Sequence, residues 1–457
     1  MNTRLILSVS TLALVQSVNQ GLNAEQQLPP NIVVIFCDDM GYGDLSCYGN
    51  PTIKTPNIDR LASEGMKFTQ FYTGAAISTP SRSSLLTGRL PVRNGMYGDK
   101  RGVLFPDSKS GLGQDEVTIA RLLKNNGYVT GCIGKWHLGA FSPFLPTDHG
   151  FDYYFGIPYS NDMSPKQNKG KHAQNYPPTP LMLGNQKIEE EPDQGELTRR
   201  YTEKAVNFIK TNREKPFFLY FAHTFPHIPL YTNARFEGSS KRGLYGDVIE
   251  EIDWSVGQVL QTLKEVGLQE NTMVVFSSDN GPWLVMQNNG GSAGPLRDGK
   301  GTWWEGGFRV PAIFWMPGHI EPCINNEIMA MMDLFPTFLS MAGVDCPKNI
   351  VLDGVNQSKM LFQGASSERD EIFYWWGSEL MAVRKGKWKY YIKTIENQYT
   401  SNCVIEIPDK PLLYDVEKDV SEKFNLASEN PEIVKQLIEL AEEHKSRMII
   451  KPAVCDM

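Results

Sequence analysis

The chain has 457 residues, enough for one large domain or two unequal ones. Hydrophobic residues make up 41% and charged residues 21%, an ordinary globular composition that excludes a disordered, collagen-like or coiled-coil protein. With 45 Lys and Arg against 52 Asp and Glu, the net charge is −7, so non-specific nucleic-acid binding is not expected. An anionic substrate would have to be held by a few positive groups placed locally.

The first segment has the pattern of a secretory signal peptide. A positive charge at Arg4 precedes the apolar run Leu5–Val15, which is long enough for a signal peptide and too short to span a bilayer. Small residues up to Ala24 then offer a cleavage site. We predict a signal at residues 1–24, export to the periplasm or outside the cell, and no stable membrane insertion. A buried N-terminal helix is the alternative, and the polar and proline residues that follow at once argue against it.

The main part of the chain alternates between two apolar patterns. Short apolar runs typical of buried parallel strands lie at residues 31–36, 128–133, 217–222, 273–277 and 312–316. Helical patterns lie between them at residues 118–123, 197–209 and 247–266. This alternation predicts an α/β fold whose sheet is covered by helices on both faces.

The last part of the chain has a different pattern. Residues 381–393 alternate and turn at Lys385-Gly386, which predicts a hairpin, and residues 412–414 form another short strand candidate. Asn430-Pro431 then begins a helix that ends at about Lys445. We therefore expect a larger domain over residues 25–365 and a small antiparallel sheet with one helix over residues 366–457.

Seven cysteines are present, an odd count. Cys37 and Cys132 lie inside apolar runs and are predicted to be core residues. The spacing of Cys323 and Cys346 permits a disulfide in an exported protein, although sequence does not decide connectivity.

Polar side chains follow four of the predicted strands. Ligands bind beyond the carboxyl ends of strands in open α/β sheets, so these side chains are expected to converge. Each taken alone could be a turn or capping residue, but four clusters after four strands indicate a site. They are Asp38 and Asp39, Lys135 and His137, His223 and His227, and Asp279 and Asn280.

The acidic members of this set predict a metal site. Asp38, Asp39, Asp279 and Asn280 all offer oxygen ligands, which suit Ca²⁺ or Mg²⁺ better than zinc. Adjacent carboxylates repel unless a cation lies between them. An ordinary acidic turn would explain Asp38-Asp39 alone, but not the second pair in an equivalent place.

A serine-rich segment predicts a helix start with a reactive end. Pro80 can open a helix through Leu86, with Gly88 near its end. Ser78 then lies at the amino end, where free N–H groups favour an anion, and Arg82 lies one turn along. On physical grounds alone, this is an ordinary helix start.

Here the residues match a family. Residues 78–89 (STPSRSSLLTGR) resemble the type I sulfatase signature, whose first residue is a Cys or Ser that a maturase oxidises to Cα-formylglycine. Similar blocks follow at residues 131–139, 279–281 and 299–307, so the resemblance covers nearly the whole predicted mature chain. Residues 90–97 and 156–160 are similar to the arylsulfatase A branch, and residues 242–247 to N-acetylgalactosamine-6-sulfatases. The resemblance implies an alkaline phosphatase/sulfatase-like fold with a large mixed sheet.

The resemblance also implies a role for each site residue. Hydrated formylglycine at Ser78 would attack sulfur, beside Ca²⁺ (or Mg²⁺) held by Asp38, Asp39, Asp279 and Asn280. Arg82 would steady the diol, Lys135 and Lys300 would bind sulfate, His137 would take a proton, and His227 would protonate the leaving oxygen, with Ser160 near the sulfate. His149, His319 and His444 are expected to be structural, as is Glu305, through Arg309 or a turn.

Ser78 departs from the commoner Cys. The resemblance then implies a radical-SAM maturase as partner and an anaerobic bacterial host. An engineered Cys-to-Ser replacement would leave the same sequence, and the sequence does not separate the two.

The predicted reaction is hydrolysis of sulfate monoesters. The implied substrates are sulfated galactose or N-acetylgalactosamine of mucin or glycosaminoglycan glycans, attacked from chain ends, with pocket loops at residues 160–176, 283–289 and 375–379. One alternative is a phosphoester hydrolase of the same superfamily, which would use unmodified Ser78 and two zinc ions. The other is an inactive glycan-binding protein, against which the intact Lys135, His137, His227 and Lys300 argue.

Overall fold

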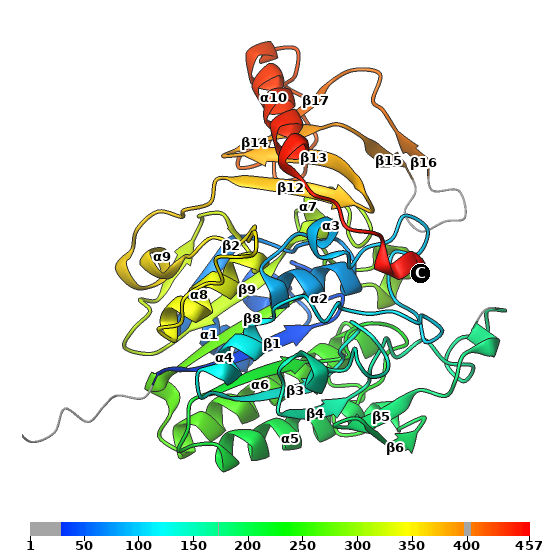
Figure 1. Ribbon diagram of the computed structural model, residues 1–457, viewed down its shortest axis with the longest axis vertical. Helices are drawn as coiled ribbons and strands as arrows, with labels where there is room; N and C mark the ends of the chain where they lie inside the picture. The colour runs from blue at the N-terminus through cyan, green and yellow to red at the C-terminus, as the bar shows by residue number, and fades with distance from the viewer. Residues whose placement is uncertain (1–28, 172, 397–403) are drawn as a thin grey trace, which may run out of the picture.

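A computed structural model describes residues 29–171, 173–396 and 404–457, so the predicted signal at residues 1–24 lies outside the described residues. In this part of the chain, an 11-stranded mixed sheet forms the centre of the larger unit (Figure 1). Its strands lie in the order β10 (Cys323–Asn325), β2 (Met66–Tyr72), β9 (Arg309–Trp315), β8 (Thr272–Ser278), β1 (Asn31–Cys37), β7 (Phe217–Ala222), β3 (Val129–Gly134), β4 (Tyr153–Gly156), β5 (Pro180–Leu183) and β6 (Gln186–Glu190), with β11 (Met329–Ala330) beside β2.

Helices cover both faces of this sheet, as the alternating pattern predicts. Side chains of β1 alternate between the two apolar layers: Val34 contributes to one and Val33 to the other. One layer contains α2 (Ser78–Thr87), α4 (Ile119–Asn125), α8 (Leu334–Met341) and α9 (Ser358–Gln363), and the other contains α1 (Pro56–Glu64), α5 (Leu197–Thr211) and α6 (Leu244–Glu265). Short helices α3 (Pro91–Asn94) and α7 (Glu305–Phe308) lie at the edge nearest the C-terminal sheet in Figure 1.

All five predicted strands are neighbours in the sheet, and four of them are parallel. The runs at residues 31–36, 128–133, 217–222 and 273–277 form β1, β3, β7 and β8, which pair in parallel in the order β8-β1-β7-β3. The prediction of a parallel strand at residues 312–316 was wrong, because β9 runs antiparallel to both β8 and β2. A continuous apolar run indicates that both faces of the strand are buried. It contains no information on the direction of the strand.

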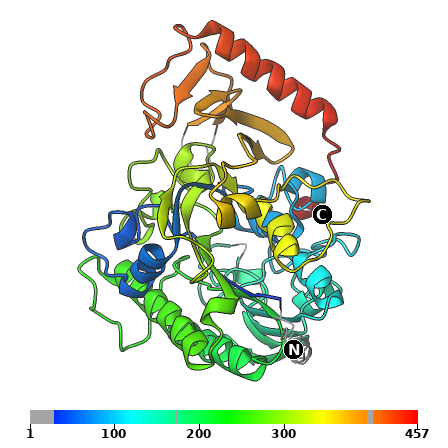
Figure 2. The same ribbon diagram turned by 90° about the vertical axis from the view of Figure 1, so that its left-hand side faces the viewer.

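The C-terminal part forms a separate antiparallel sheet with one long helix, as expected from the sequence. The sheet contains β12 (Glu371–Trp376), β13 (Glu379–Lys385), β14 (Trp388–Tyr391) and β17 (Leu412–Asp415), and a two-stranded sheet pairs β15 (Thr394–Glu396) with β16 (Val404–Glu406). The predicted hairpin is β13 and β14, with Gly386 at φ 53° in the turn. Figure 2 shows α10 (Pro431–Arg447) along the outer side of the four-stranded sheet.

Two further sequence predictions concern the cysteines and membrane insertion. Cys37 and Cys132 are buried in the core, whereas Cys323 and Cys346 are free thiols, so the disulfide that their spacing permits is not formed. Among residues 29–171, 173–396 and 404–457, no helix is both long and apolar enough to cross a membrane.

Candidate active site

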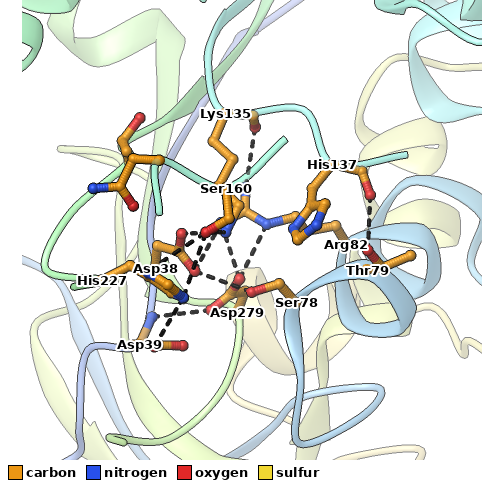
Figure 3. A network of polar contacts seen from close by, with 12 residues as sticks. Asp38, Asp39, Ser78, Thr79, Arg82, Lys135, His137, Ser160, His227 and Asp279 are labelled. Carbon is orange, nitrogen blue, oxygen red and sulfur yellow. Dashed lines mark hydrogen bonds and ion pairs between the residues drawn. The ribbon is translucent and has the colours of Figure 1, made fainter. Parts of the chain in front are cut away.

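The polar residues that follow the central parallel strands lie close together. Asp38 and Asp39 follow β1, Asp279 follows β8, and Lys135 follows β3, and Figure 3 shows these side chains pointing toward one another. The strands end side by side because β1 pairs with both β8 and β7 in register. Residues about 240 positions apart in sequence therefore come within hydrogen-bond distance, as the bond from the Asp39 backbone N–H to an Asp279 carboxylate oxygen at 3.1 Å shows.

Three buried carboxylates form the centre of this cluster. Oxygen atoms of Asp38, Asp39 and Asp279 all lie within 4.8 Å of one another. Asn280 donates its amide N–H to Asp39 at 2.8 Å, while its buried Oδ1 has no hydrogen-bond partner among the residues the structure describes. An unpartnered buried oxygen is costly, so the Oδ1 of an amide side chain that reaches Asp39 fits a ligand of a hard cation.

Three cations surround these carboxylates. The Lys135 ammonium donates to Asp38, the Lys300 ammonium lies 2.7 Å from Asp39, and the Arg82 guanidinium lies 2.9 Å from Asp279. Burial tends to raise the pKa of Asp38, but the positive groups, Lys135 first among them, hold that pKa well below its ordinary value. Burial and the Asp38 charge instead raise the pKa of Asp279 to about 7.

Ser78 lies at the first position of α2, beside the carboxylates. The sequence predicts a helix opened by Pro80, but α2 begins two residues earlier at Ser78 and ends before Gly88, whose φ is 68°. Pro80 is still within the first turn, where its missing N–H leaves no helical bond unmade. The Ser78 hydroxyl is buried and donates to Asp38 at 3.0 Å.

The ring of His137 has a defined tautomer. Its Nε2 lies 2.9 Å from the Leu104 carbonyl oxygen, which can only accept, so Nε2 carries a proton. Burial, and next the charge of Lys135, hold the pKa of His137 well below its ordinary value, so the ring is neutral and Nδ1 carries a lone pair. Nδ1 is buried and makes no hydrogen bond within the described ranges. The residue also has φ 62°, a backbone strain that fixes where the ring points.

His227 lies across the carboxylates from His137 in Figure 3, and Ser160 lies close to both His227 and Lys135. His227 Nδ1 donates to the Ile228 carbonyl at 2.5 Å, and Nε2 lies 3.6 Å from an Asp39 oxygen. The Ser160 hydroxyl lies beside both ring nitrogens, 3.5 Å from Nδ1 and 3.4 Å from Nε2. The Ser160 hydroxyl also lies 3.2 Å from the Lys135 ammonium. Trp283 packs beside His227, with ring centroids 5.6 Å apart.

The histidine nearest to His227 in sequence is not in this site. His223 is fully buried against Phe221 and lies 3.4 Å from the Ser255 hydroxyl. Burial lowers its pKa to about 3, so it remains a neutral core residue.

The other polar residues that the sequence suggests as structural lie outside the cluster. His149 stacks on Trp136, His444 stacks on Phe373 at 3.5 Å, and His319 lines a cavity beside β10. Glu305 lies 3.5 Å from Arg309, as expected, and is also bound by Tyr374 at 2.9 Å and Lys389 at 2.9 Å.

The structure adds contacts that sequence reasoning missed. The Leu104 carbonyl sets the His137 tautomer, the Thr79 hydroxyl donates to the His137 carbonyl at 3.0 Å, and Arg82 donates to the Tyr220 hydroxyl at 3.4 Å. A backbone carbonyl has no sequence signature, so nothing could have pointed to Leu104. Tyr220 lies in the predicted strand and resembled an ordinary core aromatic residue.

Comparison with protein families agrees with this geometry. The sulfatase family model matches residues 30–344, and the model for the C-terminal region of aryl-sulfatase matches residues 367–457. Human arylsulfatase A is 41% identical over 90% of this chain and 87% of its own length. Mouse N-acetylgalactosamine-6-sulfatase is 38% identical over 98% of this chain and 90% of its own length.

Solved structures extend the comparison to the fold. The PsFucS1 sulfatase from Pseudoalteromonas sp. superposes with a TM-score of 0.85 at 30% identity, covering 94% of this chain and 93% of that one. Ps i-CgsB in complex with k-i-k-neocarrahexaose superposes with a TM-score of 0.78 at 31% identity, covering 91% and 92%. The chain thus belongs to the sulfatase family and is a sulfuric ester hydrolase.

Proposed function

We propose that this protein is an exported, formylglycine-dependent sulfatase that removes sulfate from galactose or N-acetylgalactosamine units of glycans. The single observation that carries this proposal is the place of Ser78. Its hydroxyl lies at the amino end of α2, beside three buried carboxylates, with Arg82 one turn along the same helix. That is where the family resemblance requires the modified residue to be. Export rests on the signal-like sequence at residues 1–24.

The proposed metal is calcium, with magnesium as the alternative. Asp38, Asp39, Asp279 and Asn280 would hold it, since three carboxylates and an amide oxygen without a hydrogen-bond partner in the described part of the chain offer oxygen ligands only. Such an ion would polarise a sulfate oxygen and lower the pKa of a nearby hydroxyl. Lys135, Lys300 and Arg82, which contact the same carboxylates, would keep the total charge of the site close to neutral when sulfate enters.

The proposed nucleophile is the modified Ser78. Hydrated formylglycine supplies two hydroxyls on one carbon, one to attack sulfur and one whose deprotonation releases the sulfate, which an unmodified serine cannot do. His137 is suited to accept a proton because its Nδ1 is unprotonated and unpartnered in the described part of the chain. Arg82 is anchored by Asp279, and its Nη2 also lies 3.6 Å from Asp38, the carboxylate to which the Ser78 hydroxyl donates. The guanidinium is therefore placed to steady the hydroxyls at position 78.

The proposed sulfate and leaving-group contacts come from three further residues. Lys135 and Lys300 direct ammonium groups into the carboxylate cluster from two different loops, so both can contact sulfate oxygens. His227 is fixed through Nδ1 and presents Nε2 between Ser160 and Asp39. A proton on that nitrogen would face the Asp39 carboxylate and could be passed to the departing alcohol.

The proposed sugar class rests on the relatives. One is named for N-acetylgalactosamine 6-sulfate esters, and the chain covers 90% of its length at 38% identity. Of the three loops expected to face the sugar, 283–289 brings Trp283 to His227, and 160–176 begins at Ser160 in the site. Residues 375–379 comprise the end of β12, a turn at residues 377–378 and the start of β13. Trp375 and Trp376 line a narrow cavity there together with Ile77.

Two other functions are less well supported. A phosphoester hydrolase with two zinc ions needs a second ligand set, and the described residues contain one group of three clustered metal-ligating side chains. An inactive glycan-binding protein would have no use for buried cations around a buried carboxylate cluster, which are costly to maintain.

The decisive experiment is to express the chain with and without a radical-SAM maturase and measure the mass of the peptide that contains Ser78. We expect a loss of two hydrogens and an aldehyde that hydrazine traps, together with turnover of sulfate esters and far slower turnover of phosphate esters. An unmodified serine in a preparation that hydrolyses sulfate esters at full rate would refute the mechanism. Faster turnover of phosphate than of sulfate esters would instead favour the phosphoester alternative.

A further inference from the structure

A cavity of about 410 Å³ lies near the amino end of α2 and has no role in the chemistry described so far. Its lining combines two cations, two aromatic rings and an amide, together with one carboxylate. The lining residues are Lys100, Arg101, Gly102, Phe105, Asp107, Asn175 and Tyr176.

One wall of the cavity is tied to the residues on either side of Ser78. Leu104, next to Phe105, donates its N–H to the Thr79 hydroxyl at 3.2 Å and accepts a hydrogen bond from His137. Gly102 lies against Ile77, because a Cβ added there would come within 2.8 Å of the Ile77 side chain. Residues 102–105 therefore run directly past the amino end of α2.

The other wall is formed by the end of the loop at residues 160–176, which begins at Ser160 in the site. Ser160 contacts Lys135 in the carboxylate cluster, and the same loop ends at Asn175 and Tyr176 in the cavity. The wall at residues 102–105 thus contacts Ile77, Thr79 and His137, which flank the proposed sulfate site. A glycan whose sulfated sugar lies in that site could extend along this wall into the cavity.

The chemistry of the lining suits an acidic sugar. The rings of Phe105 and Tyr176 lie 6.1 Å apart, tilted by 31°, and offer apolar faces on which a sugar ring can pack. The Arg101 guanidinium lies 5.4 Å above the Phe105 ring and is held by Asp107 at 3.0 Å. That pairing balances one charge, and Lys100 leaves the lining with a net charge of +1.

The backbone that presents the two cations is fixed from the far end of the chain. The Asp456 carboxylate accepts hydrogen bonds from the backbone N–H groups of Lys100, at 3.1 Å, and of Arg101, at 2.7 Å. The lining is thereby preorganised, which reduces the entropy that binding would cost.

We propose that this cavity is a subsite for an anionic sugar, bearing a carboxylate or a sulfate, next to the sugar from which sulfate is removed. The inference rests on the proposed function and narrows its substrate class. It selects oligomers of acidic polysaccharides, such as uronate-containing or multiply sulfated glycans, over neutral mucin chains.

The test is a direct binding measurement that does not need turnover. Full-length protein expressed without maturase is titrated calorimetrically, in calcium-containing buffer, with four chondroitin tetrasaccharides: sulfated, carboxyl-reduced, desulfated, and both desulfated and carboxyl-reduced. The double variant Lys100→Met with Arg101→Gln is compared with Lys109→Met, which removes an exposed cation of the same segment that does not line the cavity. The single variant Lys100→Met leaves the Arg101–Asp107 pair intact. It serves as a second variant in case the double variant misfolds.

We expect the double variant to bind the sulfated tetrasaccharide about three- to tenfold more weakly, a range set by the modest strength of exposed charge pairs. The neutral form and the Lys109→Met variant should show no change. Weakening that persists with the carboxyl-reduced ligand assigns the anion as sulfate, and weakening that persists with the desulfated ligand assigns it as carboxylate. Equal affinities of wild type and double variant for all four ligands, or no binding by either, overturn the subsite. Failure of the proposed function is read separately, from aryl sulfate turnover by matured wild type.

Discussion

Lys389 and Glu305 form a fully buried ion pair, with 2.9 Å between the Lys389 Nζ and a Glu305 carboxylate oxygen. The pair joins β14 of the C-terminal sheet to the start of α7, just beyond the loop that carries Lys300. Lys389 also donates to the Trp303 carbonyl at 2.8 Å and lies 3.1 Å from Glu422. The Lys389 ammonium is therefore one of the contacts through which the small sheet holds the segment that follows Lys300, a proposed sulfate-binding residue.

Replacing Lys389 should destabilise the fold strongly. Lys389→Met leaves the Glu305 and Glu422 carboxylates buried without their shared cation, so we expect a loss of about 3–5 kcal/mol in the free energy of unfolding. Urea denaturation measures it. The matched control is Lys387→Met on the same hairpin, where a partly exposed pair with Asp415 should contribute about 1 kcal/mol or less. Equal losses for the two variants would contradict the prediction.

Replacing His227 should separate good leaving groups from poor ones. If His227 protonates the departing oxygen, His227→Ala should lower kcat on sugar sulfates by about 10²–10⁴-fold, and much less on activated aryl sulfates that need little protonation. Steady-state kinetics on both substrates measure the ratio. Equal losses on the two substrates would remove the acid role from His227. His223 is a useful comparison because it is buried outside the carboxylate cluster. His223→Gln should not change the ratio of kcat on aryl sulfates to kcat on sugar sulfates.

Removing divalent metal should cost both activity and stability. With calcium at about 100 times its dissociation constant, binding to the folded state contributes about 2.7 kcal/mol, which a chelator would abolish. We expect a lower melting temperature and a loss of sulfate ester turnover, both restored by Ca²⁺ or Mg²⁺. Asp39→Asn should weaken the response to added calcium. A melting temperature unchanged by the chelator in wild type would rule out the carboxylate cluster as a tight cation site.

Glu251 should make stability depend on pH. Burial raises the pKa of this α6 carboxyl to about 7, although it accepts hydrogen bonds from Thr232 at 2.8 Å and the Asn233 N–H at 2.9 Å. Between its ordinary pKa of 4.5 and about 7, the folded protein keeps a proton that the unfolded chain has lost, so stability falls as pH rises through this window.

The variant Glu251→Gln cannot ionise, so its stability relative to wild type should rise by about 1–3 kcal/mol between pH 5 and pH 8. Unfolding free energies at the two pH values test this. A difference between Glu251→Gln and wild type that is constant from pH 5 to pH 8 would show that Glu251 ionises normally.

Much of the site could be predicted from the sequence because its residues directly follow predicted strands. Asp38 and Asp39 after one apolar run, and Asp279 after another, lie together because both runs are neighbouring parallel strands. Burial on both faces produces long apolar runs, and the carboxyl ends of parallel strands share one edge. These are local patterns with a single geometric consequence, so no long-range information was needed.

The tertiary structure alone decided the direction of β9, the first residue of α2, the tautomer of His137 and the network around Glu305. Each depends on a partner far away in sequence: Lys389 meets Glu305 across 84 positions. An apolar or polar residue type states only whether a group prefers to be buried. Which partner a buried group contacts depends on how distant segments pack on the two faces of the sheet. A local sequence pattern contains no information on that packing.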